Sequence, residues 1–331
     1  MKAMLADASG RLAWTEVAEP VLRDDEVLVE IAAAGLNRAD LLQRQGKYPS
    51  PEGCPPWMGL EISGVITGMG QKAEQDARWK MGDQVCALLG GGGYAERVAV
   101  HSGMLMPVPQ GLSLAEAAAL PEAFATSYLN LFMEGKLSEG QTAYIPAGAS
   151  GLASAAIPLA KAFGARVITS VLSDEIAQSI RHLGADVIIN SKTQSVPGVL
   201  QAEAERGHPV HVVMDCLSGE DIGRCLPYMA HGGYWIVIST LAGTETAVPL
   251  RQLLTKGLHL VGSMLRNRSP DLKAHILREL TEKVWPKIES GQIRPHIYKV
   301  LPMEQAGEAH RILEHGGHTG KIVLAVKGSG S

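Results

Sequence analysis

The stretch TAYIPAGASGLASAAIPLAKAFGA, residues 142–165, decides the fold of the second half of this chain. Residues 142–146 are mostly apolar, which predicts a short buried strand, and residues 147–151 all carry very small side chains. From residue 152 onward, apolar side chains recur at the spacing of one helix face. A strand, a tight turn and a helix in this order open a dinucleotide-binding unit. In such a unit a pyrophosphate lies against free N–H groups and the positive end of the helix dipole.

The turn fits the dinucleotide fingerprint G-x-G-x-x-G/A only in part. Gly148, Ser150 and Ala153 occupy its three small-residue positions. Gly148 is expected to make the sharp turn, Ser150 to lie where the backbone approaches phosphate, and Ala153 to let the helix pack closely on the strand. Because Ser150 replaces the second glycine, a small-residue turn without a ligand is the alternative. The cofactor-binding candidates in this turn are Gly148, Ser150, Gly151 and Leu152.

After residue 165 the predicted strands and helices alternate. Runs rich in β-branched residues predict strands at 166–171, 187–189, 210–216, 234–239 and 258–261. Helices are expected near 174–183, 194–206 and 220–230. This alternation predicts the α/β class with a doubly wound parallel sheet, in which ligands bind at the carboxyl ends of the strands.

The first 110 residues have a different pattern, with short strand candidates separated by Gly, Pro and Asp turns. Such a pattern is typical of a β-rich domain. The expected strands are 1–5, 12–16, 27–34, 62–69, 84–89 and 94–100. Only residues 38–44 and the region 114–120 suggest helix.

The C-terminal part changes pattern again, with a long amphipathic helix predicted at 271–289. A strand at 297–302, a helix at 303–314 and a last strand at 321–326 follow. The last strand has no neighbour in sequence, so we expect it to pair with the first domain. Residues 327–331, KGSGS, resemble a linker and are left out of the fold.

Two domains follow from these patterns. Residues 1–120 and 265–331 form one β-rich domain closed by both chain ends, and residues 121–264 form the nucleotide-binding domain inserted between them. A chain of 331 residues is also too long for one ordinary core.

Composition restricts the function. The chain is 46% apolar with a formal charge of −4, and its basic and acidic residues are interspersed, so we expect no nucleic-acid partner. The apolar region 112–132 is interrupted by Glu116, Pro121 and Glu122, so no membrane span is expected. The N-terminus lacks the apolar core of a signal peptide. Four cysteines without C-x-x-C spacing favour reduced thiols and a cytoplasmic protein.

Several segments carry a specific resemblance. The sequence NRADLLQRQGKY at 37–48 is followed, in order, by GLEISGVI (59–66), GGGGYAERVAV (90–100), ALPEAFATSY (119–128), LRNR (265–268) and GKIVL (320–324). With the 142–165 stretch, they resemble the zinc-independent, zeta-crystallin-like quinone oxidoreductases of the medium-chain dehydrogenase/reductase superfamily. Within these, the branch of tumour-suppressor-inducible NADPH:quinone oxidoreductases is the most similar. The resemblance spans residues 1–326 and implies a GroES-like catalytic domain plus a Rossmann domain.

Zinc-dependent alcohol dehydrogenases of the same superfamily are the first alternative. A catalytic zinc needs three protein ligands and an open fourth position. In those enzymes a Cys stands where this chain has Asn37, and a His where it has Leu60. An amide and a leucine cannot replace a thiolate and an imidazole, and a four-cysteine zinc lobe is also missing. We therefore expect no metal.

The resemblance places Tyr48 and Asn37 in the substrate cleft as the catalytic candidates. A hydride converts a quinone to a stabilised hydroquinone anion, so the protein must supply orientation and a donor for the developing charge. Tyr48 is the candidate donor, although solvent could protonate the product, and Asn37 the candidate amide. Alternatively, Tyr48 packs on neighbouring prolines and Asn37 bonds its own turn. We interpret Asp40 and Arg44, four residues apart, as an ion pair on a short helix.

The resemblance also implies further cofactor contacts. Thr126 matches a threonine that hydrogen-bonds the cofactor near the nicotinamide, and bonding within its own helix turn is the alternative. Arg266 and Lys321 match cofactor-contacting positions, and exposed surface charge is the alternative for both. The remaining candidates follow predicted strands and are Ser239, Leu241 and Leu265.

The expected cofactor is NADPH, with NADH less favoured. NAD enzymes place an acid near the end of the second strand to hold the ribose 2′-hydroxyl, whereas this chain has residues 169–171, TSV, there. Ser170 stands in this run, and the resemblance implies Ser173 as the serine that phosphate-binding relatives use in a Ser-x-x-Lys pattern, so both are candidates to bind a 2′-phosphate. In relatives that bind the phosphate, a Lys stands where this chain has Ile176 and a Tyr where it has Ser191.

The leading functional hypothesis is NADPH-dependent reduction of a quinone or a related activated alkene. A 2-enoyl-thioester reductase is the second hypothesis, and a non-catalytic NADPH-binding protein with a structural or RNA-binding role is the third. Absence of a basic patch weighs against RNA binding. Because relatives associate through Rossmann-sheet edges, we expect a homodimer through the apolar strands 235–238 and 258–261.

Overall fold

The computed structural model describes residues 1–75 and 77–326, and the linker predicted at 327–331 lies outside them. The chain divides into two compact units. Unit 1 comprises Met1–Ala125, Arg266–Gly291 and the residues from Pro295 onward, and unit 2 comprises Thr126–Leu265 with Gln292–Arg294. Within the described residues, no helix has the length and apolar character required to cross a membrane.

Unit 1 is built on β-sheets. A mixed sheet has the order β14-β15-β3-β4-β5-β7, with β6 paired to β3, and β1 and β2 form a separate antiparallel pair. The strands are β1 (Lys2–Ala6), β2 (Leu12–Glu16), β3 (Glu26–Gly35), β4 (Glu61–Met69), β5 (Gln84–Leu88), β6 (Arg97–His101), β7 (Leu105–Pro107), β14 (Ile297–Pro302) and β15 (Lys321–Ala325). Since β15 pairs antiparallel with β3, the prediction that the last strand returns to the first domain is confirmed.

The helices of unit 1 are mostly short. They are α1 (Arg38–Arg44), α2 (Gln71–Glu74), η1 (Ser102–Met104), α3 (Leu114–Ala117), α10 (Pro270–Lys283), α11 (Trp285–Glu289), η5 (Met303–Gln305) and α12 (Ala306–His315), and α4 (Pro121–Tyr128) crosses into unit 2. The single helix predicted at 271–289 is wrong, because the chain breaks it between α10 and α11. Pro286 has no N–H to donate, and its ring would clash with the preceding turn.

Unit 2 is the predicted doubly wound parallel sheet, in the order β10-β9-β8-β11-β12-β13. Its strands are β8 (Thr142–Ile145), β9 (Arg166–Val171), β10 (Val187–Asn190), β11 (Val210–Asp215), β12 (Met229–Val237) and β13 (His259–Gly262). The chain runs from β8 outward to β10 and then returns to β11, so the strand order reverses between β8 and β11. A ligand crevice is expected at the carboxyl side of this reversal.

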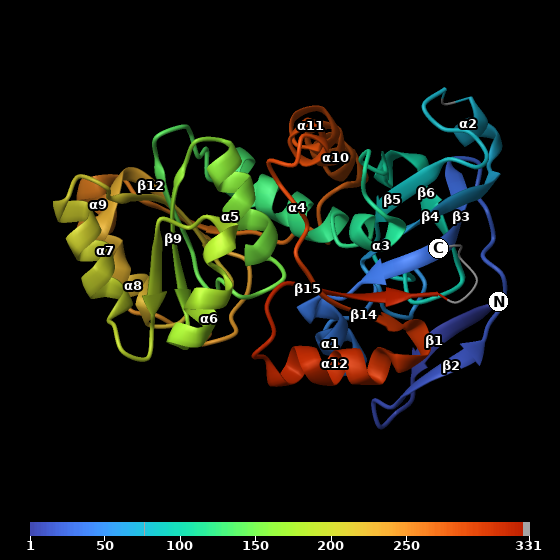
Figure 1. Ribbon diagram of the computed structural model, residues 1–331, viewed down its shortest axis with the longest axis horizontal. Helices are drawn as coiled ribbons and strands as arrows, with labels where there is room; N and C mark the ends of the chain where they lie inside the picture. The colour runs from blue at the N-terminus through green and yellow to red at the C-terminus, as the bar shows by residue number, and fades with distance from the viewer. Residues whose placement is uncertain (76, 327–331) are drawn as a thin grey trace. The chain divides into compact units, whose positions relative to one another are not determined.

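Helices cover both faces of this sheet (Figure 1). They are η2 (Leu129–Glu134), α5 (Ala153–Ala162), α6 (Asp174–Ser179), η3 (Arg181–Leu183), α7 (Val196–Glu205), α8 (Asp221–Cys225), η4 (Leu226–Tyr228) and α9 (Leu250–Lys256). Ala143 and Ile145 of β8 pack on the α5 side, whereas Tyr144 packs on the α7 and α8 side. Successive side chains of β8 thus point to opposite faces of the sheet. Because both faces are covered by helices, positions on both faces of the strand are apolar.

Two expectations for unit 2 are wrong. The helix predicted at 220–230 ends at Cys225, since a 3₁₀ turn containing Pro227 follows and β12 already begins at Met229. Of residues 235–238, expected at a sheet edge, 235–237 lie in β12, which pairs with β11 and β13. Only β13, of the two expected strands, lies at an edge.

Candidate active site

The turn after β8 has the features of a phosphate-binding loop. A Cβ on Gly148 would lie 2.4 Å from Thr169 Oγ1, so only glycine fits there. Ser150 Oγ accepts a hydrogen bond at 3.1 Å from the N–H of Ala153, the first residue of α5. Ala147 has φ +55°, a left-handed conformation that is uncommon for alanine and clusters at ligand-binding sites.

This turn leaves backbone donors unused. Within the described part of the chain, the N–H groups of Ala149, Gly151 and Leu152 donate no hydrogen bond. They stand at the start of α5, a helix of ten residues, where the helix dipole favours an anion. The turn therefore fits the pyrophosphate of a dinucleotide. That Gly148, Ser150, Gly151 and Leu152 bind the cofactor stays a prediction.

At the end of β9 the two predicted serines have different surroundings. Ser170 is buried, and its hydroxyl lies 3.0 Å from the hydroxyl of Tyr144. Ser173 caps α6, accepting the N–H of Ile176 at 3.2 Å. The acids Asp174 and Glu175 occupy the first turn of this helix. The sequence interpretation considered only residues 169–171 at the strand end and did not weigh these two acids, and the preference for NADPH stays a prediction.

The other candidates in unit 2 lie on α4 and in the segments that follow β12 and β13. Thr126 is on α4, and its carbonyl accepts the amide of Asn130 at 2.7 Å in the π-helix η2. π-Helical turns are frequent at functional sites, which could have drawn attention to Asn130. Its amide oxygen is buried and has no hydrogen-bond partner within the described residues. Ser239, Leu241 and Leu265 follow β12 and β13, and only Leu241 among them is exposed.

In unit 1, Asn37 belongs to a buried polar cluster with Glu61 and Lys321. Lys321 Nζ donates to Asn37 Oδ1 at 2.9 Å, to Leu36 O at 2.7 Å and to Glu61 Oε1. Asn37 Nδ2 donates to the same Glu61 oxygen at 2.9 Å. Both ends of the Asn37 amide are thus fixed, which fixes its orientation. Its shorter hydrogen bonds go to β4 and β15, while Nδ2 also donates to Gly35 O at 3.4 Å, so the alternative of an amide bonding its own turn describes a secondary contact.

Lys321 is 5% exposed and Glu61 fully buried. The alternative that Lys321 is an exposed surface charge is therefore wrong. A buried ion pair does little for net stability, but removing one partner leaves an uncompensated charge and costs ~3–5 kcal/mol. All three acceptors of the ammonium group belong to unit 1, so this lysine anchors Asn37, and its contact with a cofactor stays a prediction.

Asp40 holds the start of α1 in place. Its carboxylate accepts the N–H groups of Asn37 at 2.8 Å and Gly59 at 3.1 Å, and the hydroxyl of Tyr94 at 3.1 Å. Burial raises the pKa of Asp40 to about 6 despite these hydrogen bonds. The ion pair predicted between Asp40 and Arg44 is wrong, because Arg44 pairs with Glu314 of α12 instead. The sequence spacing could not show that Asp40 faces the core.

Tyr48 follows α1 and is held by Arg266. The guanidinium carbon lies 4.4 Å from the Tyr48 ring centroid, a cation–π geometry. Its N–H groups donate to Tyr48 O at 3.2 Å, Gln43 Oε1 at 3.0 Å and Gly90 O at 2.8 Å. Arg266 is 6% exposed, so the surface-charge alternative is wrong for it as well. Its guanidinium fixes the Tyr48 loop, and a direct contact with a cofactor stays a prediction.

Two titratable residues near Tyr48 escaped the sequence analysis. Burial, with the charge of Glu61, raises the pKa of Glu122 to about 8. Burial lowers the pKa of Lys273, which donates to Arg266 O at 2.6 Å, while the charge of Glu122 opposes that shift. Glu122 lies in the segment 119–128 that carries the resemblance, but nothing in that segment or around Lys273 marked either residue as part of this site, so only the fold could assign them to it.

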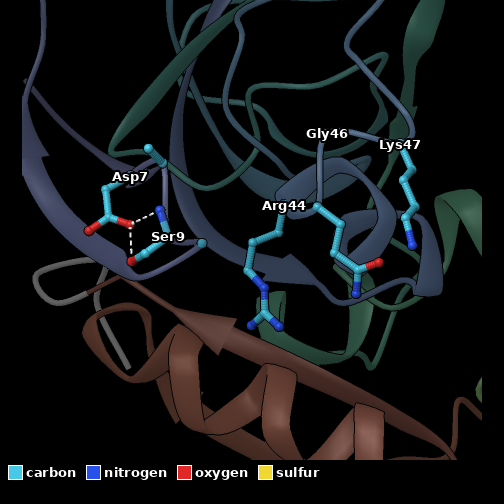
Figure 2. A pocket seen from close by; sticks show the side chains of 8 residues that line it. Asp7, Ser9, Arg44, Gly46 and Lys47 are labelled. Atoms are coloured by element: carbon cyan, nitrogen blue, oxygen red, sulfur yellow. Dashed lines mark hydrogen bonds between the residues drawn. The ribbon is translucent and has the colours of Figure 1, made fainter.

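A separate groove of about 560 Å³ lies on unit 1 between the β1–β2 turn and the end of α1 (Figure 2). Asp7 accepts the hydroxyl of Ser9 at 2.6 Å, and the Arg44 side chain lies across from this turn. These contacts organise the turn itself, and none of the catalytic or cofactor candidates lines the groove.

The donor set does not fit a zinc ion. Both ends of the Asn37 amide are hydrogen-bonded, to Lys321 and Glu61. The buried apolar side chain of Leu60 stands where zinc-dependent relatives have a His ligand. Among the described residues, no group of three or more His, Cys, Asp or Glu side chains is arranged to hold a metal. The four cysteines are free thiols.

Comparisons with known proteins agree with this architecture. A family model described as "Alcohol dehydrogenase GroES-like domain" matches residues 23–110, and one described as "Zinc-binding dehydrogenase" matches residues 183–324. The "Quinone oxidoreductase-like protein 2 homolog" of Nematostella vectensis is 29% identical over 92% of this chain and 83% of its own length.

Two solved structures are similar as well. The quinone oxidoreductase from Thermus thermophilus, described also in complex with NADPH, is 31% identical, with a TM-score of 0.81 over 98% of this chain and 100% of that chain. The JamJ enoyl reductase is 26% identical, with a TM-score of 0.82 over 95% of both chains.

The chain belongs to the medium-chain dehydrogenase/reductase superfamily, as its sequence segments predicted. It is an oxidoreductase of that family, with the predicted GroES-like and Rossmann folds. Its relatives include quinone oxidoreductases.

Proposed function

We propose that this chain reduces quinones with NADPH, without a metal. The observation that carries the proposal is the site around Asn37, where zinc ligands are replaced by an amide fixed by Lys321 and Glu61. A quinone needs no Lewis acid, because the anion formed by hydride addition is stabilised by aromatic delocalisation. The similarity to the Thermus thermophilus quinone oxidoreductase supports the same substrate class.

When bound, NADPH supplies the hydride. In this proposal the turn Gly148–Leu152 binds the pyrophosphate through its unused N–H groups and the dipole of α5. Ser170, Ser173, Thr126, Ser239, Leu241 and Leu265 are the further cofactor-binding candidates on unit 2, and Arg266 and Lys321 are those on unit 1.

Asn37 and Tyr48 are the proposed catalytic pair. The Tyr48 phenol donates a hydrogen bond to the substrate oxygen as negative charge develops there, and the fixed amide of Asn37 orients the ring. Burial raises the pKa of Tyr48, so the phenol keeps its proton at neutral pH. A donor positioned before the reaction stabilises the transition state without reorganisation.

A homodimer is proposed through β13, the edge strand of unit 2. Within the described residues no strand pairs with its outer side, and Leu260 of this strand is exposed. An apolar edge of this kind favours pairing with a second copy. A cytoplasmic location is proposed from the four free thiols.

The decisive assay follows NADPH absorbance with 9,10-phenanthrenequinone, beside NADH and a crotonyl thioester. Rapid quinone turnover that prefers NADPH and resists a chelator is the expected result. Turnover of the thioester alone would establish the enoyl-reductase alternative, which the JamJ similarity favours. Binding of NADPH without turnover of either substrate would indicate the non-catalytic role.

A further inference from the structure

Two turns at the carboxyl edge of the parallel sheet in unit 2 contain a residue with an uncommon backbone conformation. Among the residues that the structure describes, the non-glycine residues with positive φ are Lys136, Ala147 and Ser218. Ala147 follows β8 and Ser218 follows β11, the two strands between which the strand order reverses. Such conformations cluster at ligand-binding sites, and a ligand crevice is expected at this reversal. The turn after β11 is therefore a candidate for the second wall of that crevice.

The conformation of this turn is fixed by Asp215, the last residue of β11. One carboxylate oxygen of Asp215 accepts the N–H groups of Leu217 at 2.8 Å and of Ser218 at 2.9 Å. The other oxygen accepts the indole N–H of Trp235 on β12 at 2.8 Å. Because Asp215 is buried, these hydrogen bonds are shielded from water and hold the turn firmly against β12.

The turn is bonded to residues 239–243, which follow β12. Ser218 Oγ donates a hydrogen bond to Ser239 O at 2.7 Å, and the N–H of Ala242 donates to Leu217 O at 2.7 Å. Residues 239–243 belong to no helix or extended strand, so no regular element fixes their course. Their position therefore depends on the contacts with the turn.

Residues 239–243 lie on the half of the sheet where a nicotinamide is expected. A doubly wound sheet has two mononucleotide-binding halves, and the half with the phosphate turn also binds the adenosine ribose, near the end of its second strand. The half formed by β11, β12 and β13 is thus expected to receive the nicotinamide. Leu241 is exposed although it is apolar, and so is Met264 after β13. Apolar side chains of this kind suit the flat face of a cofactor ring.

We propose that Ser218 is a positioning residue for the cofactor: its hydroxyl holds residues 239–243 in the conformation that receives the nicotinamide. This inference rests on the proposed function, which supplies the nicotinamide cofactor. Ser218 is buried and acts through the backbone of Ser239, so it does not itself touch the cofactor. The left-handed backbone, which serine rarely adopts, brings the hydroxyl within hydrogen-bond distance of that carbonyl.

The test measures the affinities of two ligands by calorimetry, in wild type and in Ser218→Gly. The ligands are NADPH and 2′-phospho-ADP-ribose, which lacks the nicotinamide ring. Glycine adopts the left-handed backbone readily, so this substitution removes the hydroxyl and leaves the turn intact. We expect the Kd of NADPH to rise on the order of 5- to 10-fold, the effect of about one lost hydrogen bond. The Kd of 2′-phospho-ADP-ribose should change by less than about twofold.

Two further variants separate the hydroxyl from the backbone conformation. Ser218→Ala also lacks the hydroxyl but keeps a Cβ in the left-handed region. It should therefore match Ser218→Gly in NADPH affinity and unfold at a lower denaturant concentration. Lys136→Gly is the matched control, because it places glycine at another left-handed position, an exposed one that precedes β8. It should leave both affinities within about twofold of wild type.

The outcomes separate this inference from the proposed function. Equal weakening of both ligands in Ser218→Gly, or an unchanged NADPH affinity, overturns the positioning role even when quinones are turned over. If neither Ser218 variant folds, the residue is a structural one and the proposal is overturned as well. If wild type binds NADPH but reduces no quinone, the proposed reaction fails, and the affinities still decide the role of Ser218. If wild type does not bind NADPH, both fail.

Discussion

The turn after β8 in unit 2 and the cluster around Glu61 in unit 1 fix their geometry by different means. The turn uses backbone: a left-handed Ala147, a glycine that admits no Cβ, and N–H groups left unused at the start of a helix. The cluster uses side chains: an amide, two carboxylates and an ammonium group drawn from α1, β4 and β15. Backbone geometry follows from local sequence, whereas the cluster exists only when distant strands pair.

Mutations in the two regions should also have different effects, on stability in the cluster and on nucleotide binding in the turn. Loss of a charge in the cluster leaves its partner buried, so the expected damage is to folding. Damage in the turn should instead reach nucleotide binding, because its donors serve a ligand. Four variants test this comparison, beginning with the largest expected effect.

Lys321→Met should lower the free energy of unfolding by ~3–5 kcal/mol, because Glu61 is left buried without its cation. Denaturant titration measures the change. Lys299→Met, at an exposed position of β14, should change the free energy by less than about 0.5 kcal/mol. A loss below about 1 kcal/mol in Lys321→Met would show that the cluster does not depend on its charge pair.

Gly148→Ala should weaken NADPH binding and cost ~1–3 kcal/mol of stability, because its Cβ would collide with Thr169 Oγ1 and the Ile180 side chain. Fluorescence titration of NADPH gives the affinity. Gly262→Ala is the control, since a Cβ there meets nothing within 4 Å. Equal effects of the two substitutions would contradict a special role for the turn.

Arg266→Gln should raise the pKa of Tyr48, because the guanidinium charge lowers it. Loss of the loop contacts should also reduce kcat/KM for the quinone by about 10-fold through misplacement of Tyr48. Absorbance titration and steady-state kinetics measure the two effects. An unchanged phenol titration would show that Arg266 does not act on Tyr48.

Glu175→Gln should shift cofactor preference toward NADPH by about two- to fivefold, because one exposed negative charge is removed near the expected 2′-phosphate. The ratio of kcat/KM for NADPH and NADH is the measurement. The shift should shrink in high salt, as expected for an exposed charge. If kcat/KM changed by the same factor with NADPH and with NADH, Glu175 would lie away from the 2′ position.

The sequence alone predicted most of the fold. The β8–α5 stretch, the α/β alternation and the return of β15 were predictable, because hydrophobic period and small-residue turns are local properties of the chain. The predicted lengths of two helices were wrong. The helix expected at 220–230 ends before Pro227, and the one expected at 271–289 is broken before Pro286. The expectation of no zinc rests on the resemblance, which places Asn37 and Leu60 where zinc-dependent relatives have a Cys and a His.

Only the tertiary structure decided the partners of the charged residues. Asp40 and Arg44 have the spacing of an ion pair, yet Asp40 faces Tyr94 in the core and Arg44 faces Glu314 on α12. Lys321 has the appearance of a surface lysine but meets Glu61, 260 residues away in sequence. Charge is a property of one residue, whereas its burial and partners are set by segments that meet only after folding, so no local pattern records them.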